Sequence, residues 1–211
     1  MTLPFFAIIL VGTLTAAACD SGPSTARTPV GPSSMPANMD AGMGAGMGTM
    51  SMPGMRLQSE FDYLTKMIPH HEEAIARATM LQQGTQRPEM RSFARSIIET
   101  QTAEVQQMQR FLAARYPGRD TYADYAPMMR DLTGLRADAL DRAFLEDMVP
   151  HHMMAVMMSQ RLLMAGLADN DELIPFARNI RDVQHSEIRM MAGWLEAWFG
   201  AAPLGHGMMW H

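Results

Sequence analysis

The sequence is poor in features that mark several common classes of protein. A single cysteine among 211 residues excludes an internal disulfide and any zinc site built on paired cysteines. Aromatic residues make up 7% of the chain, which disfavours an all-β sandwich or barrel. The 17 Lys and Arg residues are outnumbered by 22 Asp and Glu, for a net charge of -5. This excess argues against a nucleic-acid-binding protein, because such proteins carry a basic patch or stripe.

The first 18 residues are expected to be a signal peptide. They are uncharged and mostly apolar, and they end in three alanines directly before Cys19. This apolar run is too short for a convincing transmembrane span. A lone cysteine after small residues resembles a bacterial lipobox, which implies that Cys19 is lipidated and becomes the mature N-terminus. An ordinary signal peptide followed by a free cysteine is the alternative. Both interpretations predict export to the cell envelope, facing the periplasm or the extracellular side.

Methionine is the feature in excess, with 24 residues, and much of it lies near the ends of the chain. Residues 19–57 are expected to be a disordered linker, since Gly, Pro, Ser, Ala and Met dominate without a helical or strand period. Thioethers suit Cu(I) and are poor ligands for hard cations. The alternative is a low-complexity spacer. The candidate soft-metal ligands in the linker and in the flexible tail 200–211 are Met35, Met39, Met43, Met47, His206, Met208, Met209 and His211.

Residues 58–199 contain an internal repeat. Residues 67–71 read Met-Ile-Pro-His-His, and residues 148–152 read Met-Val-Pro-His-His at an offset of 81. A Phe-Ala-Arg motif begins at residue 93 and again at residue 176. Each half predicts one helical hairpin. Helical periodicity with Gly and Pro stop signals predicts helices over 59–83, 88–115, 135–165 and 171–199. Two short connections and one longer one then predict an all-α, ferritin-like four-helix bundle made of two duplicated hairpins.

A three-four spacing places Met, His and Glu side chains on the core-facing side of the helices in each repeat. A Met precedes a His by four residues there, and neighbours at that spacing can share one ion. The pairs His71–Glu104 and His152–Glu187 fit either plain hydrogen-bonded pairs or a metal centre. In the latter, Glu is a ligand or orients the imidazole. Thioether with imidazole favours copper, and zinc is the second choice. The candidate ligands are Met67, His70, His71, Glu104, Met108, Met148, His151, His152, His185, Glu187 and Met191.

The doubled Pro-His-His motif, each copy followed by a Phe-Ala-Arg … Gln-x-x-Glu helix, resembles the bacterial domain of unknown function 305 family. The resemblance covers about residues 58–199. It implies a ferritin-like four-helix fold and, because the family includes CopM-like periplasmic copper-binding proteins, a copper-binding or copper-tolerance role. A copper transport or resistance protein would then be a partner. The positions that match are Met67, His70, His71, Glu104, Met148, His151, His152 and Glu187.

We expect a copper-binding protein that buffers or delivers the metal, and no catalytic residues. A di-iron oxidase needs Glu-x-x-His on two helices, and this sequence has none. The nearest match is Asp182-x-x-His185, in one repeat only. The first alternative is a structural or interaction lipoprotein of the envelope that binds no metal. A di-iron-type oxidase is a minor one. The expected partners are a metal ion and the membrane, through the lipid anchor, but no nucleic acid.

Overall fold

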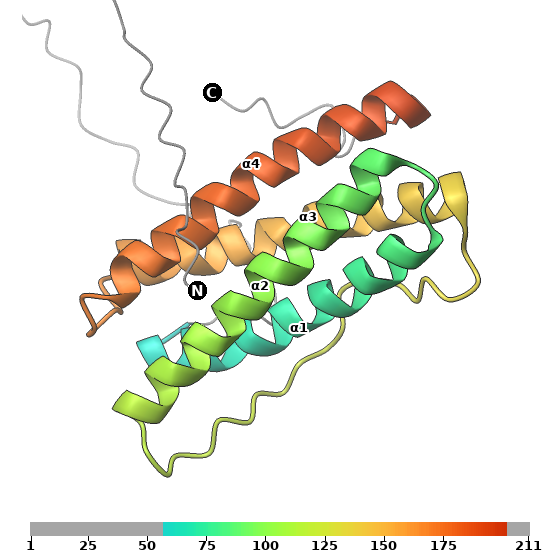
Figure 1. The fold of residues 1–211 in the computed structure, drawn as a ribbon. Coiled ribbons are helices and arrows are strands. Elements are labelled where there is room, and N and C mark those ends of the chain that lie inside the picture. Colours follow the sequence, from blue (N-terminus) through green and yellow to red (C-terminus); the bar gives the residue numbers. More distant parts are fainter. Residues whose placement is uncertain (1–56, 202–211) are drawn as a thin grey trace, which may run out of the picture. The chain divides into compact units, whose positions relative to one another are not determined.

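The computed structural model describes residues 57–201, and this part of the chain contains four helices and no strand (Figure 1). The helix bounds predicted from the sequence agree with the observed ones to within two residues. None of the described helices is both long and apolar enough to cross a membrane. Cys19, the signal peptide, most of the linker and the tail ligands lie outside the described residues. The helices are α1 (Glu60–Gly84), α2 (Pro88–Arg115), α3 (Ala137–Met164) and α4 (Leu173–Phe199).

Local sequence signals explain where the helices begin and end. The Ser59 side chain accepts a hydrogen bond from the backbone N–H of Asp62 at 3.1 Å and so caps the start of α1. Pro88 opens α2, where a missing N–H costs nothing. Gly200 ends α4 in the left-handed conformation, with φ 61°, which glycine adopts without strain. Both α1 and α3 continue through an internal proline, Pro69 and Pro150 respectively.

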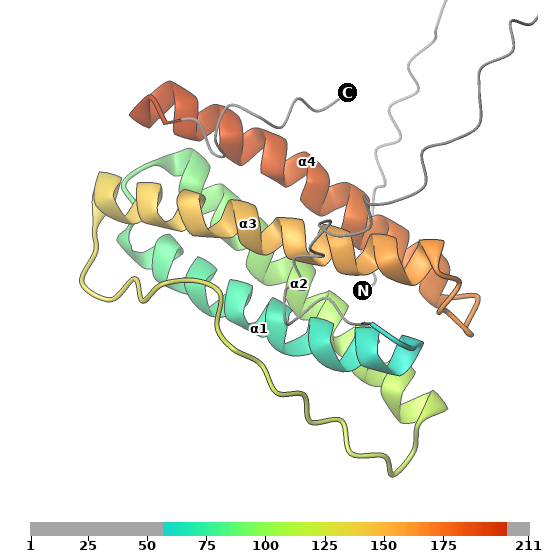
Figure 2. The ribbon, with the colours of Figure 1, turned by 180° about the vertical axis from the view of Figure 1, so that it is seen from behind.

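The two hairpins pack together through their first helices. Contacts join α1 to α2, α3 to α4, and α1 to α3. The long crossover from α2 to α3 runs along α1 in both views (Figures 1 and 2). Two aromatic pairs bridge α2 and α4: Phe93 meets Trp194 with ring centroids 5.5 Å apart, and Phe111 meets Phe176 at 5.6 Å. Each pair joins repeat-equivalent positions in exchanged order, so the bundle is close to two-fold symmetric. The sequence therefore correctly predicts an all-α bundle of two hairpins.

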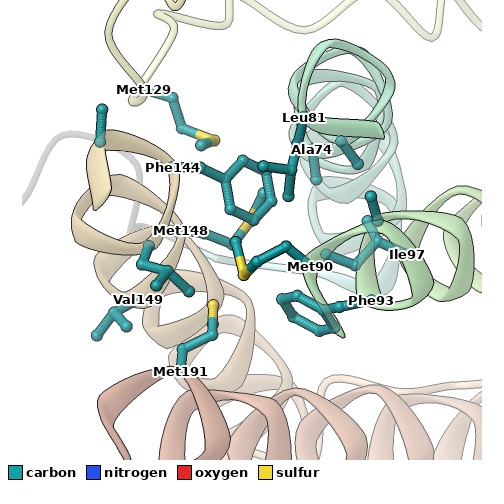
Figure 3. Close-up of a cluster of buried hydrophobic side chains, with 14 of the residues drawn as sticks. Ala74, Leu81, Met90, Phe93, Ile97, Met129, Phe144, Met148, Val149 and Met191 are labelled. Carbon is teal, nitrogen blue, oxygen red and sulfur yellow. The ribbon is translucent and has the colours of Figure 1, made fainter. Parts of the chain in front are cut away.

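The apolar core is divided into two clusters by a polar layer at the middle of every helix. In α1 the second cluster ends at Met67 and the first begins at Ala74, with His70 and His71 between them. The other three helices show the same interruption, at Gln101 and Glu104 in α2, His151 and His152 in α3, and Gln184 in α4. Figure 3 shows the first cluster, in which Met90, Met148 and Met191 approach one another from three helices. The second cluster includes Met67, Met108 and Tyr63.

The core-facing positions predicted from the three-four spacing are those that the fold buries. The residues predicted at these positions in α1 and α3 have essentially no exposed surface; they are Leu64, Met67, His71, Ala74, Ala78 and Leu81 in α1 and Leu145, Met148, His152, Ala155, Ser159 and Leu162 in α3. In α4 the two exceptions are Glu187 and Trp194, which are half-buried. The side chains at these two positions of α4 are therefore partly exposed to solvent.

Candidate metal centre

The polar layer contains four histidines, one pair from α1 and one from α3. All four are buried, with at most 1% of their surface exposed. Adjacent residues on a helix point about 100° apart, so each Pro-His-His motif directs one imidazole to each of two neighbouring helices. The first histidine of each pair meets its counterpart across the α1–α3 contact, and the second faces the other helix of its own hairpin.

The second histidine of each motif is hydrogen-bonded to a glutamate of the partner helix. His71 Nε2 lies 2.9 Å from Glu104 Oε2, and His152 Nε2 lies 2.8 Å from Glu187 Oε2. The Glu104 side chain is 8% exposed and that of Glu187 is 16% exposed. Two repeat-equivalent imidazole–carboxylate pairs therefore occupy the positions that the duplication predicts.

The first histidines of the two motifs stack face to face. The rings of His70 and His151 have centroids 3.7 Å apart and an interplanar angle of 25°. His70 Nε2 lies 3.1 Å from the carbonyl oxygen of His151. His151 Nε2 lies 3.4 Å from Glu73 Oε2, an ion-pair distance at which the geometry falls short of a hydrogen bond. The two halves of the site thus differ, because one ring faces a carbonyl and the other a carboxylate.

Glu73 fastens the crossover to this side of the bundle. Its carboxylate accepts hydrogen bonds from the Tyr125 hydroxyl and from the backbone N–H groups of Met128 and Met129, both at 3.0 Å. Burial alone would raise the pKa of Glu73, but these bonds and the contact with His151 outweigh it and lower the pKa to about 2. The sequence analysis missed Glu73. The available signal was a break in the repeat, since the equivalent position, 81 residues later, is Met154.

Burial keeps the stacked imidazoles neutral. Desolvation lowers the pKa of His70 well below 6.5, and the neighbouring His151 lowers it further. Desolvation also lowers the pKa of His151 to about 4, although Glu73 acts in the opposite direction. Neutral imidazole is the form that binds metals, so the environment holds these rings in the competent protonation state.

Several polar atoms of this layer lack a hydrogen-bond partner within the described part of the chain. They include Nδ1 of all four buried histidines, Oε1 of Gln101 and both amide atoms of Gln184. A buried polar group without a partner costs about 1–3 kcal/mol. A layer with so many free lone pairs fits a site that binds a further group.

The predicted thioether ligands lie on both sides of the polar layer. Met67 and Met108 belong to the second apolar cluster, whereas Met148 and Met191 belong to the first. All four are fully buried, and each precedes the histidine or follows the glutamate of its own hairpin by four residues. His185 occupies a half-buried position on α4. Among the described residues, no three His, Cys, Asp or Glu side chains are grouped as a metal-binding set. The carboxylates face imidazoles instead, and thioethers would have to complete any coordination sphere.

Comparisons with known proteins find one matching family model and several similar solved structures. The family model described as "Domain of unknown function (DUF305)" matches residues 16–112, 121–195 and 141–209. The structure titled "CopM in the Cu(I)-bound form" is 30% identical, with a TM-score of 0.61, over 68% of this chain and all of that one. "CopM in the Ag-bound form (by co-crystallization)" matches equally well.

A more distant likeness concerns the fold alone. A "putative secreted protein DUF305 from Streptomyces coelicolor" is 24% identical, with a TM-score of 0.60, over 69% of this chain and 95% of that one. A search of curated proteins finds no match.

Proposed function

The chain belongs to the DUF305 family, and on that premise we propose that it is an exported metal-binding protein that buffers or delivers copper in the cell envelope. The observation that carries this proposal is the polar layer of four buried histidines, flanked on both sides by buried methionines. The CopM structures in Cu(I)-bound and Cu(II)-bound forms support copper as the metal. An N-terminal lipid on Cys19 would hold the bundle at a membrane.

The residues present fit a soft or borderline ion. The free Nδ1 atoms offer imidazole donors that are already desolvated, and Met67 and Met148 offer thioethers one helical turn away. Imidazole and thioether together select copper over Mg²⁺ or Ca²⁺, which require oxygen ligands. In such a site Glu104 and Glu187 would hold the imidazoles in place, and the ion would bind to the soft imidazole and thioether donors.

An anaerobic Cu(I) competition titration against a chromophoric chelator tests the histidines. We expect the full chain to bind tightly and His71→Ala/His152→Ala to lose more than about 100-fold in affinity, since loss of an outer-sphere partner alone costs 10–100-fold. The matched control is His206→Ala/His211→Ala in the tail. If only the tail variant weakens binding, the ends of the chain hold the copper. If the full chain binds no copper, zinc or a role as an interaction protein takes precedence.

A second pair of variants separates coordination by methionine from packing. Met67→Leu/Met148→Leu preserves volume, so it should cost less than about 1.5 kcal/mol of stability while it removes two sulfurs. We expect weaker Cu(I) binding at nearly unchanged unfolding. The control is Met164→Leu, because the Met164 side chain is 77% exposed and lies outside both clusters. Equal Cu(I) affinity in the two variants would assign the buried methionines to the core alone.

A further inference from the structure

The four buried imidazoles present the same ring nitrogen to the protein. In three of them Nε2 is hydrogen-bonded to an acceptor, which is a core glutamate for two rings and a backbone carbonyl for the third, and in His151 it lies at the longer ion-pair distance of 3.4 Å from Glu73. In each of them Nδ1 is buried and has no hydrogen-bond partner within the described residues. This regularity includes both repeats and both members of each Pro-His-His motif, although the acceptors come from different elements.

The chemistry of the acceptors fixes the tautomer. A neutral imidazole carries one N–H, and the other ring nitrogen has only a lone pair. An ionised carboxylate and a carbonyl oxygen have no hydrogen to donate. A ring nitrogen that is hydrogen-bonded to either of them must therefore carry the hydrogen. In the three hydrogen-bonded rings this places the hydrogen on Nε2 and leaves the free lone pair on Nδ1. For His151 the same assignment rests on its ion pair with Glu73, whose carboxylate faces Nε2 at 3.4 Å.

Nδ1 atoms without a partner are costly in a buried core. Each buried acceptor without a donor loses its solvation, and a low local dielectric increases that cost. Four such atoms lie in one layer, and a metal ion satisfies a nitrogen lone pair as a proton donor would. A carboxylate that accepts from the opposite nitrogen also makes the donor nitrogen more basic.

We propose that Glu73, Glu104 and Glu187 are positioning residues that hold His151, His71 and His152 in the Nε2–H tautomer, as the His151 carbonyl holds His70, so that Nδ1 is the atom that binds a soft monovalent cation. This inference rests on the proposed function, because it names the donor atom of that same site. It assigns the carboxylates to the imidazoles rather than to the metal.

Nitrogen-15 NMR of the full chain, labelled at histidine, tests the assignment directly. Long-range correlations within each ring show which nitrogen carries the hydrogen, and Ag(I) serves as a diamagnetic probe. We expect the Nε2–H tautomer at the four buried histidines before Ag(I) is added. After addition, the Nδ1 resonances should shift while the Nε2 hydrogens remain.

Matched variants test whether the glutamates set the tautomer. In Glu73→Gln the side-chain amide can donate as well as accept, so the lock on His151 should relax into a mixture of tautomers. Ag(I) affinity should fall by roughly 10-fold to 100-fold. The control is Glu72→Gln, the adjacent and exposed residue, which should change neither quantity. The wild-type spectra decide the tautomer even if the Glu73 variant folds poorly.

The possible outcomes separate this inference from the proposed function. A response at Nε2 in place of Nδ1, or Ag(I) binding without any imidazole response, would overturn the inference and leave a metal-binding protein. Failure of the full chain to bind either Ag(I) or Cu(I) would overturn both. A buried histidine that carries its hydrogen on Nδ1 before metal is added would refute the lock by itself.

Discussion

The residue that ties the site together is Glu73. Its carboxylate contacts His151, the Tyr125 hydroxyl and two backbone N–H groups of the crossover, so one side chain connects α1, α3 and the segment between the hairpins. The contact with His151 and the three donors of the crossover lower the pKa of Glu73 and hold it ionised, and His151 stays neutral because burial opposes its charge. Charge at this point of the bundle is therefore set by local contacts.

Stability of the metal-free chain should fall as the pH drops. The pKa of His151 is about 4 in the fold against 6.5 for a free imidazole, and that of His70 is also lowered. Between the folded and the unfolded pKa, the unfolded chain binds a proton that the fold excludes. Each such histidine therefore lowers the free energy of unfolding by up to about 1.4 kcal/mol for each unit that the pH falls. For His151 this loss of unfolding free energy begins as the pH falls through 6.5 and is complete towards pH 4. Glu73, with a pKa of about 2 against 4.5, adds a loss below pH 4.5.

Urea unfolding at several pH values measures this slope. We expect His151→Gln to flatten it between pH 6.5 and 4, whereas His185→Gln, at a half-buried position on α4, should leave the contribution of His151 in place. A wild-type chain whose unfolding free energy is constant over this range would show that the buried imidazoles titrate normally.

At the scale of elements, each helix combines an apolar seam with a polar interruption at its centre. Two glycines, one inside α4 and one directly after its last residue, differ in backbone conformation. Gly193 lies inside the helix with open space around the position of a Cβ atom, and Gly200 ends the helix with φ +61°. Gly193 raises the conformational entropy of the unfolded chain and meets no structural need in the helix. Gly200 supplies a conformation that other residues adopt with strain.

The two glycines of α4 should respond in opposite directions to the same substitution. Gly193→Ala should stabilise the bundle by up to about 1 kcal/mol through helix propensity. Gly200→Ala should destabilise it by about 1 kcal/mol, because alanine is strained in the left-handed region. Thermal and urea unfolding of the two variants provide the measurement. Destabilisation by both substitutions would mean that Gly193 has a packing role that its open surroundings do not show.

At the scale of the whole molecule, the nearly symmetric bundle has one asymmetric feature. The imidazole–carboxylate pairs His71–Glu104 and His152–Glu187 repeat faithfully, with Nε2–Oε2 distances of 2.9 and 2.8 Å. The surroundings of the stacked pair His70–His151 do not repeat, because a single crossover joins the hairpins and Glu73 binds it. The polar layer joins both hairpins through α1 and α3, so an ion bound there would link the halves of the molecule.

Metal bound in this layer should stabilise the entire fold. At a free Cu(I) concentration 100 times the dissociation constant, linkage predicts about 2.7 kcal/mol of added unfolding free energy. Anaerobic urea unfolding of the full chain with and without Cu(I) measures it, and His71→Ala/His152→Ala should show little gain. Tight Cu(I) binding that leaves the unfolding transition unchanged would place the metal outside the four helices, for example on the methionines of residues 19–57.

The sequence by itself determined the helices, their order and most of the buried positions. Periodicity and the stop signals at glycine and proline are local, and duplication made each local pattern visible twice, so the pairing of His71 with Glu104 could be predicted. Only the tertiary structure decided that His70 stacks on His151, and that Glu73 holds the crossover beside them. These contacts join residues far apart in the chain, and one crossover serves two repeats. No repeat pattern or helical period could therefore encode them.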